Sequence, residues 1–117
     1  MKHVLAVDDS IVDSLLIYRI LVKLGFIVTT CNTVLDAINS MGVRKVDVLV
    51  VDLAMPEIGG FELISHIREH DKKLPIVVIS AFADEWNKQK AFQLGTSYYI
   101  EKPYTPDNIK RVFSQWL

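Results

Sequence analysis

The stretch VDVLVVDL, residues 46–53, decides the fold of this chain. Its aliphatic residues run almost without a break, as in a central parallel strand that helices cover on both faces. Four further runs have strand character, and each leads into a helix-like segment: residues 3–7, 26–31, 76–80 and 98–101. Strand and helix therefore alternate five times with short connections, which favours right-handed crossovers. The pattern predicts an α/β fold with a doubly wound parallel sheet.

Local signals mark where the helices begin and end. Ser10 with Asp13 three residues later is typical of a helix N-terminus, and Gly25 suits a left-handed C-terminal cap. Thr105 followed by Pro106 begins the last helix. The first helix is expected to bury one stripe of apolar side chains: Ile11, Leu15, Leu16, Ile20 and Leu24. Five strands in this arrangement match the flavodoxin-like (βα)5 fold, with strand order 2-1-3-4-5.

Composition limits the classes of function. At 117 residues we expect one domain, residues 1–117, and a net charge of -1 with no basic run argues against direct binding of nucleic acid. No apolar stretch reaches the roughly 18 residues that span a bilayer, and the acidic start excludes a signal-peptide core. We therefore expect a cytoplasmic protein that does not bind membranes. The single cysteine, Cys31, is expected to be buried and without redox function.

Polar residues stand where four of the predicted strands end. Asp8 and Asp9 follow the first strand, Asp52 the third, Ser80 the fourth and Lys102 the fifth. In an open parallel sheet the carboxyl ends of the strands meet in one crevice, where ligands bind. Carboxylates a few ångströms apart repel, so they must take up a proton or bind a cation. Three carboxylates, a hydroxyl and an ammonium predict a site for a hard cation and a phosphoryl group.

These landmarks resemble a known family over the whole chain. The matching pieces are Asp8-Asp9, the segment DLAMPEIGGFEL at residues 52–63, Ser80, and the segment YIEKPY at residues 99–104. In order and spacing they are similar to the response-regulator receiver domain of two-component signalling. The resemblance implies a phosphoacceptor switch that promotes its own phosphorylation and dephosphorylation.

The resemblance also implies a role for each site residue. Asp52 would be the phosphoacceptor, and Mg²⁺ would be the cofactor. The ion would be bound directly by Asp9 and Asp52, through water by Asp8, and by the backbone carbonyl of Ala54. Lys102 would hold the opposite side of the phosphoryl group.

A second set of residues would transmit the signal. By the same resemblance, Ser80 and Tyr99 would be the switch residues, and a cis peptide bond would precede Pro103. The surface that changes would be formed by the fourth helix, the fifth strand and the fifth helix, with contributions from Trp86, Lys88, Lys90, Tyr104 and Lys110.

Partners follow from the resemblance. The phosphodonor would be a sensor histidine kinase or a phosphotransfer protein, and the receiver of the signal a downstream effector protein or output domain. A phosphorylation-linked dimer stays open. Two positions affect the phosphoryl lifetime in this family, the second residue after Asp52 and the second after Ser80. They are Ala54 and Phe82 here, and neither side chain can hydrogen-bond a hydrolytic water, so we expect slow dephosphorylation.

Alternative interpretations remain. A receiver-like interaction module could keep the fold without using phosphorylation, although the complete acidic set argues against it. A haloacid-dehalogenase-like phosphatase has an Asp-x-Asp motif, whereas Asp8 and Asp9 are adjacent. An FMN-binding flavodoxin is disfavoured because the first loop is acidic. His3, His66 and His70 share no ligand spacing by sequence, and we expect them at the surface without a function.

Overall fold

The sheet has five parallel strands in the order β2-β1-β3-β4-β5, as predicted. The structure is a computed structural model that describes residues 1–55 and 58–117. The strands are β1 (His3–Val7), β2 (Ile27–Cys31), β3 (Val48–Val51), β4 (Ile76–Ser80) and β5 (Tyr98–Glu101). The helices are α1 (Ile11–Leu24), α2 (Val34–Val43), α3 (Gly60–His70), α4 (Glu85–Gln93) and α5 (Pro106–Phe113), followed by a short 3₁₀ turn, η1 (Ser114–Trp116). Pro56 and Glu57, within the motif at residues 52–63, lie outside the described residues.

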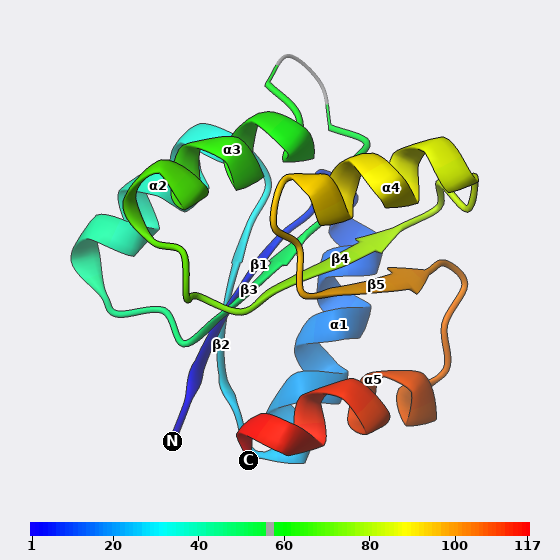
Figure 1. The fold of residues 1–117 in the computed structure, drawn as a ribbon. Coiled ribbons are helices and arrows are strands. Elements are labelled where there is room, and N and C mark those ends of the chain that lie inside the picture. The colour runs from blue at the N-terminus through cyan, green and yellow to red at the C-terminus, as the bar shows by residue number, and fades with distance from the viewer. Residues whose placement is uncertain (56–57) are drawn as a thin grey trace.

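Helices cover both faces of the sheet (Figure 1). One core packs α1 and α5 against the sheet through side chains such as Leu21, Ile109 and Phe113. The other packs α2, α3 and α4 through side chains such as Ala37 and Ile64. All four residues of β3 are buried, which explains why its sequence is continuously aliphatic rather than alternating.

The predicted caps are confirmed. Ser10 Oγ accepts a hydrogen bond from the Asp13 backbone N–H at 3.2 Å, and α1 ends at Gly25 with a φ of 110°. Thr105 Oγ1 caps α5 by accepting from the Asn108 N–H at 3.2 Å, with Pro106 in the first turn. These bonds satisfy backbone donors that have no partner within the helix. The caps therefore fix the boundaries between α1 and α5 and the loops that adjoin them.

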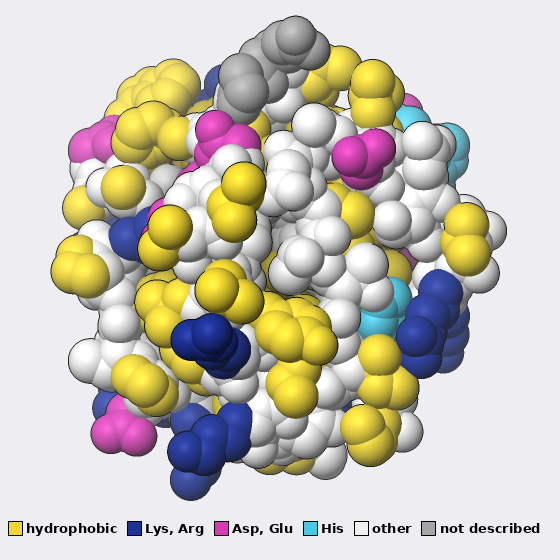
Figure 2. Space-filling model, turned by 180° about the vertical axis from the view of Figure 1, so that it is seen from behind, with side chains coloured by type: hydrophobic (Ala, Val, Ile, Leu, Met, Phe, Trp, Pro, Cys, Tyr) yellow, Lys and Arg dark blue, Asp and Glu magenta, His cyan; other side chains and the backbone are white. Residues whose placement is uncertain are grey.

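The predicted apolar stripe of α1 is wrong for Ile11, Leu15 and Leu16, whereas Ile20 and Leu24 pack against the core. The helix buries Ser14, Ile17 and Leu21, whereas Ile11 is 76% exposed. Leu15 and Leu16 are also exposed, and Ile20 and Leu24 are only partly buried. Figure 2, which views the molecule from behind, shows hydrophobic side chains at the surface among charged ones. Apolar residues lie on nearly every side of this helix, so periodicity alone could not select the face that packs.

Gly60 begins α3 at a point of close backbone approach. A Cβ atom at this position would lie 2.4 Å from the Asp52 carbonyl oxygen and 2.9 Å from the Leu53 Cα. The absence of a side chain therefore lets α3 start directly against the segment that carries Asp52. This contact links the first turn of α3 to the carboxyl end of β3.

His3 is buried, and the expectation that it lies at the surface is wrong. Its Nδ1 lies 2.8 Å from the Lys45 carbonyl oxygen and its Nε2 lies 2.8 Å from Thr29 Oγ1. Both ring nitrogens thus have polar partners, which makes burial of the ring favourable. Cys31 is buried and is a free thiol. Within the described parts of the chain, no helix has the length and apolar character needed to cross a membrane.

Candidate functional site

Three carboxylates gather at the carboxyl edge of the sheet. β1 and β3 are paired neighbours with Val7 opposite Val51, so Asp8 and Asp9 emerge beside Asp52. Each of these aspartates offers a carboxylate oxygen, and the three oxygens all lie within 4.8 Å of one another. Asp8 and Asp52 are buried, whereas Asp9 is exposed. The arrangement is open to solvent on one side and can hold a cation with oxygen ligands.

Hydrogen bonds hold the loop after β1 in place. The Asp8 carbonyl oxygen accepts from Asn32 Nδ2 at 3.0 Å and from Ser14 Oγ at 3.2 Å. The Asp8 carboxylate accepts from the Ser10 backbone N–H at 2.9 Å. These contacts come from the loop after β2, from α1 and from the N-cap of α1, and together they fix the backbone and the carboxylate of Asp8.

Lys102 supplies the only cation that forms ion pairs with these aspartates among the described residues. Its Nζ lies 2.8 Å from Asp8 Oδ2, 3.0 Å from Asp13 Oδ2 and 3.7 Å from Asp52 Oδ2. Burial alone would lower the pKa of this ammonium, but the hydrogen bonds that it donates to Asp8 and Asp13, together with the negative charge of Asp52, outweigh burial and raise the pKa. Lys102 is therefore charged at any physiological pH. The peptide bond between Lys102 and Pro103 is cis, as expected.

The Asp52 carboxyl has a pKa above its ordinary value. Burial, followed by the negative charge of Asp8, raises its pKa from 3.8 to about 6, although Lys102 and the Ala54 N–H act in the opposite direction. The Ala54 N–H donates to Asp52 Oδ1 at 3.3 Å. In the protein without a metal, burial and the charge of Asp8 thus disfavour the ionised form of Asp52. A bound cation would stabilise that form.

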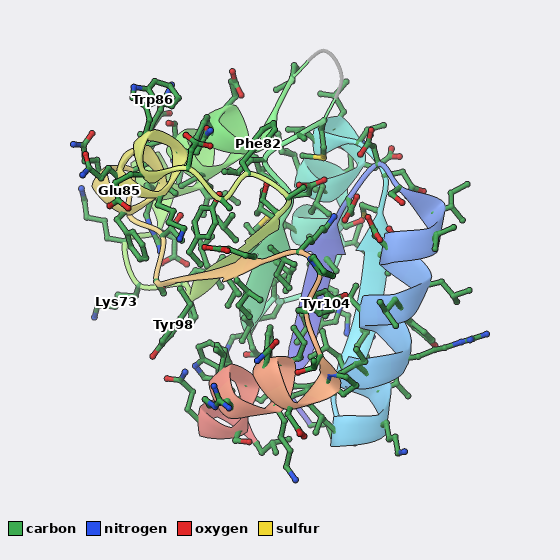
Figure 3. All side chains as sticks on the ribbon, turned by 90° about the vertical axis from the view of Figure 1, so that its right-hand side faces the viewer. Lys73, Phe82, Glu85, Trp86, Tyr98 and Tyr104 are labelled. Carbon is green, nitrogen blue, oxygen red and sulfur yellow. The ribbon has the colours of Figure 1, made fainter. Side chains whose placement is uncertain are left out.

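The predicted switch residues lie on the neighbouring strands. Ser80 ends β4 and is fully buried, and its Oγ accepts from the Phe82 backbone N–H at 3.2 Å. Tyr99 in β5 is half-buried, and its hydroxyl donates to the Phe82 carbonyl oxygen. Burial is the main cause that raises the pKa of this phenol. Phe82 lies in the connection between β4 and α4 (Figure 3). The side chains of Ser80 and Tyr99 are therefore both hydrogen-bonded to the backbone of Phe82.

Sequence reasoning missed two residues of the site. Asp13 was identified only as part of a helix start, yet it is an ion-pair partner of Lys102. It lies in the first turn of α1, close in sequence to Asp8 and Asp9, so an acidic residue at that place was an available signal. Tyr104 was assigned only to the surface that changes on signalling, yet it also lines a small cavity at the site together with Asp13 and Ile17. Burial raises its pKa to about 12.

The other surface residues extend from α4 to α5. Trp86 is 66% exposed and projects from the start of α4 (Figure 3). Lys88 pairs with Glu101 of β5, and its ammonium lies 5.9 Å from the centre of the Tyr99 ring. Lys90 lies 4.6 Å from the centre of the Phe61 ring. Ion-pair and cation–π contacts therefore connect α4 to β5 and to α3.

The fold and the acidic edge define a receiver-like class of α/β protein, and the sequence comparison is specific. The family model described as response regulator receiver domain matches residues 4–114. The two-component response regulator ORR3 of Oryza sativa is 33% identical over 113 residues, covering 94% of this chain and 86% of the relative. The chain belongs to the response-regulator receiver domain family.

Solved structures show the same fold. The chemotaxis protein CheY4 of Vibrio cholerae matches with a TM-score of 0.93 at 28% identity, covering 100% of this chain and 99% of that one. The receiver domain of the sensor histidine kinase PA1611 of Pseudomonas aeruginosa matches with a TM-score of 0.88 at 25% identity, with 98% and 96% covered. That structure holds a magnesium ion in its active-site cleft.

Proposed function

We propose that this chain is a Mg²⁺-dependent phosphoacceptor switch whose acceptor is Asp52. The observation that carries the proposal is the arrangement of Asp8, Asp9 and Asp52 with carboxylate oxygens within 4.8 Å, together with Lys102. Docking alone would not require a buried carboxylate with a raised pKa beside a lysine. The switch would occupy one receiver domain, residues 1–117.

The acidic cluster has the ligands that Mg²⁺ prefers. This ion takes oxygen ligands, keeps several waters, and is commonly bound by one or two carboxylates and a phosphate. Asp9 and Asp52 would bind it directly, Asp8 through water, and the Ala54 backbone carbonyl would complete the set. When bound, Mg²⁺ would neutralise charge on the carboxylates and on the incoming phosphoryl oxygens.

Asp52 would act as the nucleophile. One of its carboxylate oxygens attacks the phosphorus in line, the bond from phosphorus to the donor breaks, and an acyl phosphate forms on Asp52. The carboxylate must be ionised to attack. Because its pKa of about 6 lies below neutral pH, most Asp52 is ionised there even without a metal.

Lys102 and Ser80 would respond to the new phosphoryl group. Lys102 Nζ is 3.7 Å from Asp52 Oδ2, so a small movement lets it donate to a phosphoryl oxygen. Ser80 would release the Phe82 N–H and donate its own hydroxyl to the same group. Tyr99 is bonded to Phe82, so a shift of this segment reaches β5 directly.

The energy of these contacts is sufficient for a conformational switch. A hydrogen bond to a charged group contributes roughly 1.5–3 kcal/mol, so two new ones contribute about 3–6 kcal/mol. Moving an equilibrium from 1:99 to 99:1 requires about 5.5 kcal/mol of differential stabilisation. Phosphorylation would therefore drive most of the population to the active state.

The partners would be those of a receiver domain. A sensor histidine kinase or a phosphotransfer protein would donate the phosphoryl group, and an effector protein or output domain would recognise the surface formed by α4, β5 and α5. We place the domain in the cytoplasm, where such kinases present their phosphohistidine. Neither nucleic acid nor membrane is a direct partner in this proposal.

Intact-mass spectrometry after incubation with acetyl phosphate tests the proposal. We expect one phosphoryl adduct on the wild-type chain that requires Mg²⁺ and is absent from Asp52→Ala. Asp107→Asn is a matched control, because Asp107 is an exposed aspartate in the first turn of α5. No adduct on any protein would instead favour a phosphorylation-independent interaction module.

A further inference from the structure

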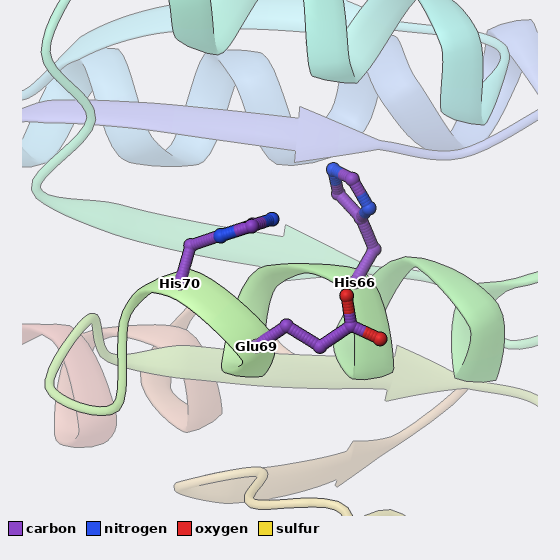
Figure 4. Close-up of side chains that lie close together, drawn as sticks. All are labelled: His66, Glu69 and His70. Atoms are coloured by element: carbon purple, nitrogen blue, oxygen red, sulfur yellow. The ribbon is translucent and has the colours of Figure 1, made fainter.

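A second cluster of metal-binding side chains lies on α3. His66, Glu69 and His70 each offer a ligand atom, and the three atoms lie within 4.8 Å of one another (Figure 4). The expectation that the histidines share no ligand spacing is therefore wrong for His66 and His70. They are four residues apart, the separation at which two histidines on one helix bind zinc in metalloproteases. The centres of their rings lie 5.4 Å apart.

Helix geometry places the three ligands on one side. At 3.6 residues per turn each residue is rotated by about 100°, so His66, Glu69 and His70 fall within an arc of about 100°. All three side chains are exposed. Among the hydrogen bonds and ion pairs of the described residues, none involves the Glu69 carboxylate or either imidazole. The ligand atoms are therefore available to an ion from solvent.

The helix that carries these residues is firmly held. Leu63, Ile64 and Ile67 of the same helix are buried in the core. Arg68 turns away from the cluster, and its guanidinium donates to the Gly95 carbonyl oxygen at 2.8 Å and to the Leu74 carbonyl oxygen at 2.7 Å. This cation is thus occupied by backbone acceptors, and the backbone beneath the three ligands is fixed.

Nearby groups leave the cluster accessible. Lys90 lines one surface hollow together with His66 and Glu69, but its ammonium lies over the Phe61 ring at 4.6 Å and the Trp86 ring at 5.1 Å. On the other side His66 and His70 line a second hollow with residues of α2, Ile38, Met41 and Gly42. Neither hollow places a cation in an ion pair with the Glu69 carboxylate.

We propose that His66, Glu69 and His70 form a surface site for a divalent transition-metal ion of the zinc type. Two imidazoles and one carboxylate suit zinc, whereas Mg²⁺ prefers oxygen ligands alone. Ligand atoms on a tetrahedral zinc ion lie about 3.3 Å apart, given bonds of about 2.0–2.1 Å. Rotation of three exposed side chains closes the remaining distance, and water fills the fourth position.

The proposed zinc site is separate from the acidic cluster. His70 lies ten residues after Gly60, which corresponds to about 15 Å along α3. A zinc ion bound by residues 66, 69 and 70 would lie on the last two turns of this helix. The two clusters share no residue, so the test of the zinc site does not depend on the function of Asp52.

Isothermal titration calorimetry with ZnCl₂ on tag-free protein tests the zinc site. Excess Mg²⁺ is present throughout to compete for the acidic cluster, and a repeat on Asp52→Ala shows whether any zinc binds there. We expect one zinc ion per chain on both proteins. His66→Gln and His70→Gln should each weaken binding at least about tenfold, and Glu69→Gln by a smaller factor. Asp107→Asn is the matched control and should bind as the wild type does.

A thermal unfolding series gives a second readout. Zinc should raise the Tm of the wild type but not that of the His66→Gln, His70→Gln double variant, because only the folded helix brings the ligands together. If the wild type binds no zinc in excess Mg²⁺, or the double variant binds it equally tightly, the proposal is wrong. Unchanged affinity in Glu69→Gln would remove Glu69 from the site.

Discussion

At the scale of single residues, Asp52 combines burial with negative charge. It is only 6% exposed, lies beside Asp8, and depends on Lys102 for partial compensation. Each of these features was encoded at a different position in the sequence, and the parallel sheet brings them to one edge. The chemistry proposed for Asp52 therefore comes at the expense of stability in the protein without a metal, and that effect is measurable.

Asp52→Asn should stabilise the metal-free protein near neutral pH. A carboxyl whose pKa is raised from 3.8 to about 6 on folding disfavours the folded state when ionised, so the penalty is absent below pH 3.8 and complete above about 6. At 1.36 kcal/mol per pKa unit, the gain for Asp52→Asn near pH 7.5 is about 1–3 kcal/mol. Urea unfolding in EDTA measures it, with Asp107→Asn as the control.

The comparison at two pH values makes this prediction specific. Near pH 3.5 wild type and Asp52→Asn should unfold at nearly the same urea concentration, because the carboxyl is protonated in the folded state and mostly protonated in the unfolded state. Adding Mg²⁺ near pH 7.5 should stabilise the wild type more than the variant. A wild type that is the more stable protein in EDTA near neutral pH contradicts the electrostatic account of Asp52.

Phe82 and Ala54 should make the phosphoryl group long-lived. Phe82 is 41% exposed beside the end of β4, and neither its side chain nor that of Ala54 can orient a water molecule. Phe82→Glu or Ala54→Asn should accelerate spontaneous dephosphorylation by about tenfold, which is below the 10²–10⁴ of a well-positioned base. The decay of the phosphoryl adduct by intact mass measures the rate. Phe92→Glu, on the exposed side of α4, is the control, and unchanged rates in both site variants refute the hypothesis.

At the scale of the elements, the strands and most helix boundaries could be predicted. Continuous aliphatic runs and local caps such as Ser10 and Thr105 depend on near neighbours in the sequence, so they are visible there. The buried face of α1 was not, because Ile11, Leu15 and Leu16 are as apolar as the residues that pack. The burial of His3 depends on Lys45 and Thr29, which only the folded chain brings to its ring.

In the candidate site too, some features could be predicted from the sequence and others depend on contacts that only the folded chain makes. Asp8, Asp9, Asp52 and Lys102 were predicted to lie together because parallel strands share a carboxyl edge, and the structure brings them together. The part of Asp13 in pairing with Lys102 required knowing that α1 turns this side chain toward β5. The roles of all these residues in phosphoryl transfer stay predictions.

Gly60→Ala tests how tightly α3 is joined to the Asp52 segment. Its Cβ would lie 2.4 Å from the Asp52 carbonyl oxygen, so backbone must move, and we expect a loss of about 1–3 kcal/mol in the free energy of unfolding. Gly42→Ala in α2 is the matched control. Its Cβ would meet nothing within 4 Å, and it should stabilise the protein by about 0.5–1 kcal/mol. Urea unfolding distinguishes the two, and equal effects contradict the close-approach argument.

At the scale of the whole molecule, signalling would be a change in population between two arrangements of one fold. The path of direct contacts runs from Ser80 to the Phe82 segment, from there to Tyr99, and then to α4 through Lys88 and its pairing with Glu101. Each step is a direct contact between described residues. The three central strands, β1, β3 and β4, are buried at every residue and give these movements a rigid reference.

Tryptophan fluorescence should report this change. The chain has two tryptophans, and Trp86 stands on α4 whereas Trp116 packs near Phe113. Phosphorylation should alter the emission of wild type and of Trp116→Phe, but not that of Trp86→Phe. Ser80→Ala should reduce the change by at least about half, because it removes one of the two new hydrogen bonds. A full response in Ser80→Ala would mean that the signal does not pass through Ser80.

The most direct test of the central claim is to locate the phosphorylated residue. Borohydride reduces an acyl phosphate on aspartate to homoserine, and peptide mass spectrometry then identifies the converted position. After treatment with acetyl phosphate and Mg²⁺, we predict homoserine at residue 52 and at no other aspartate. Conversion at Asp8, Asp9 or Asp13, or no conversion in a protein that binds Mg²⁺, would contradict Asp52 as the phosphoacceptor.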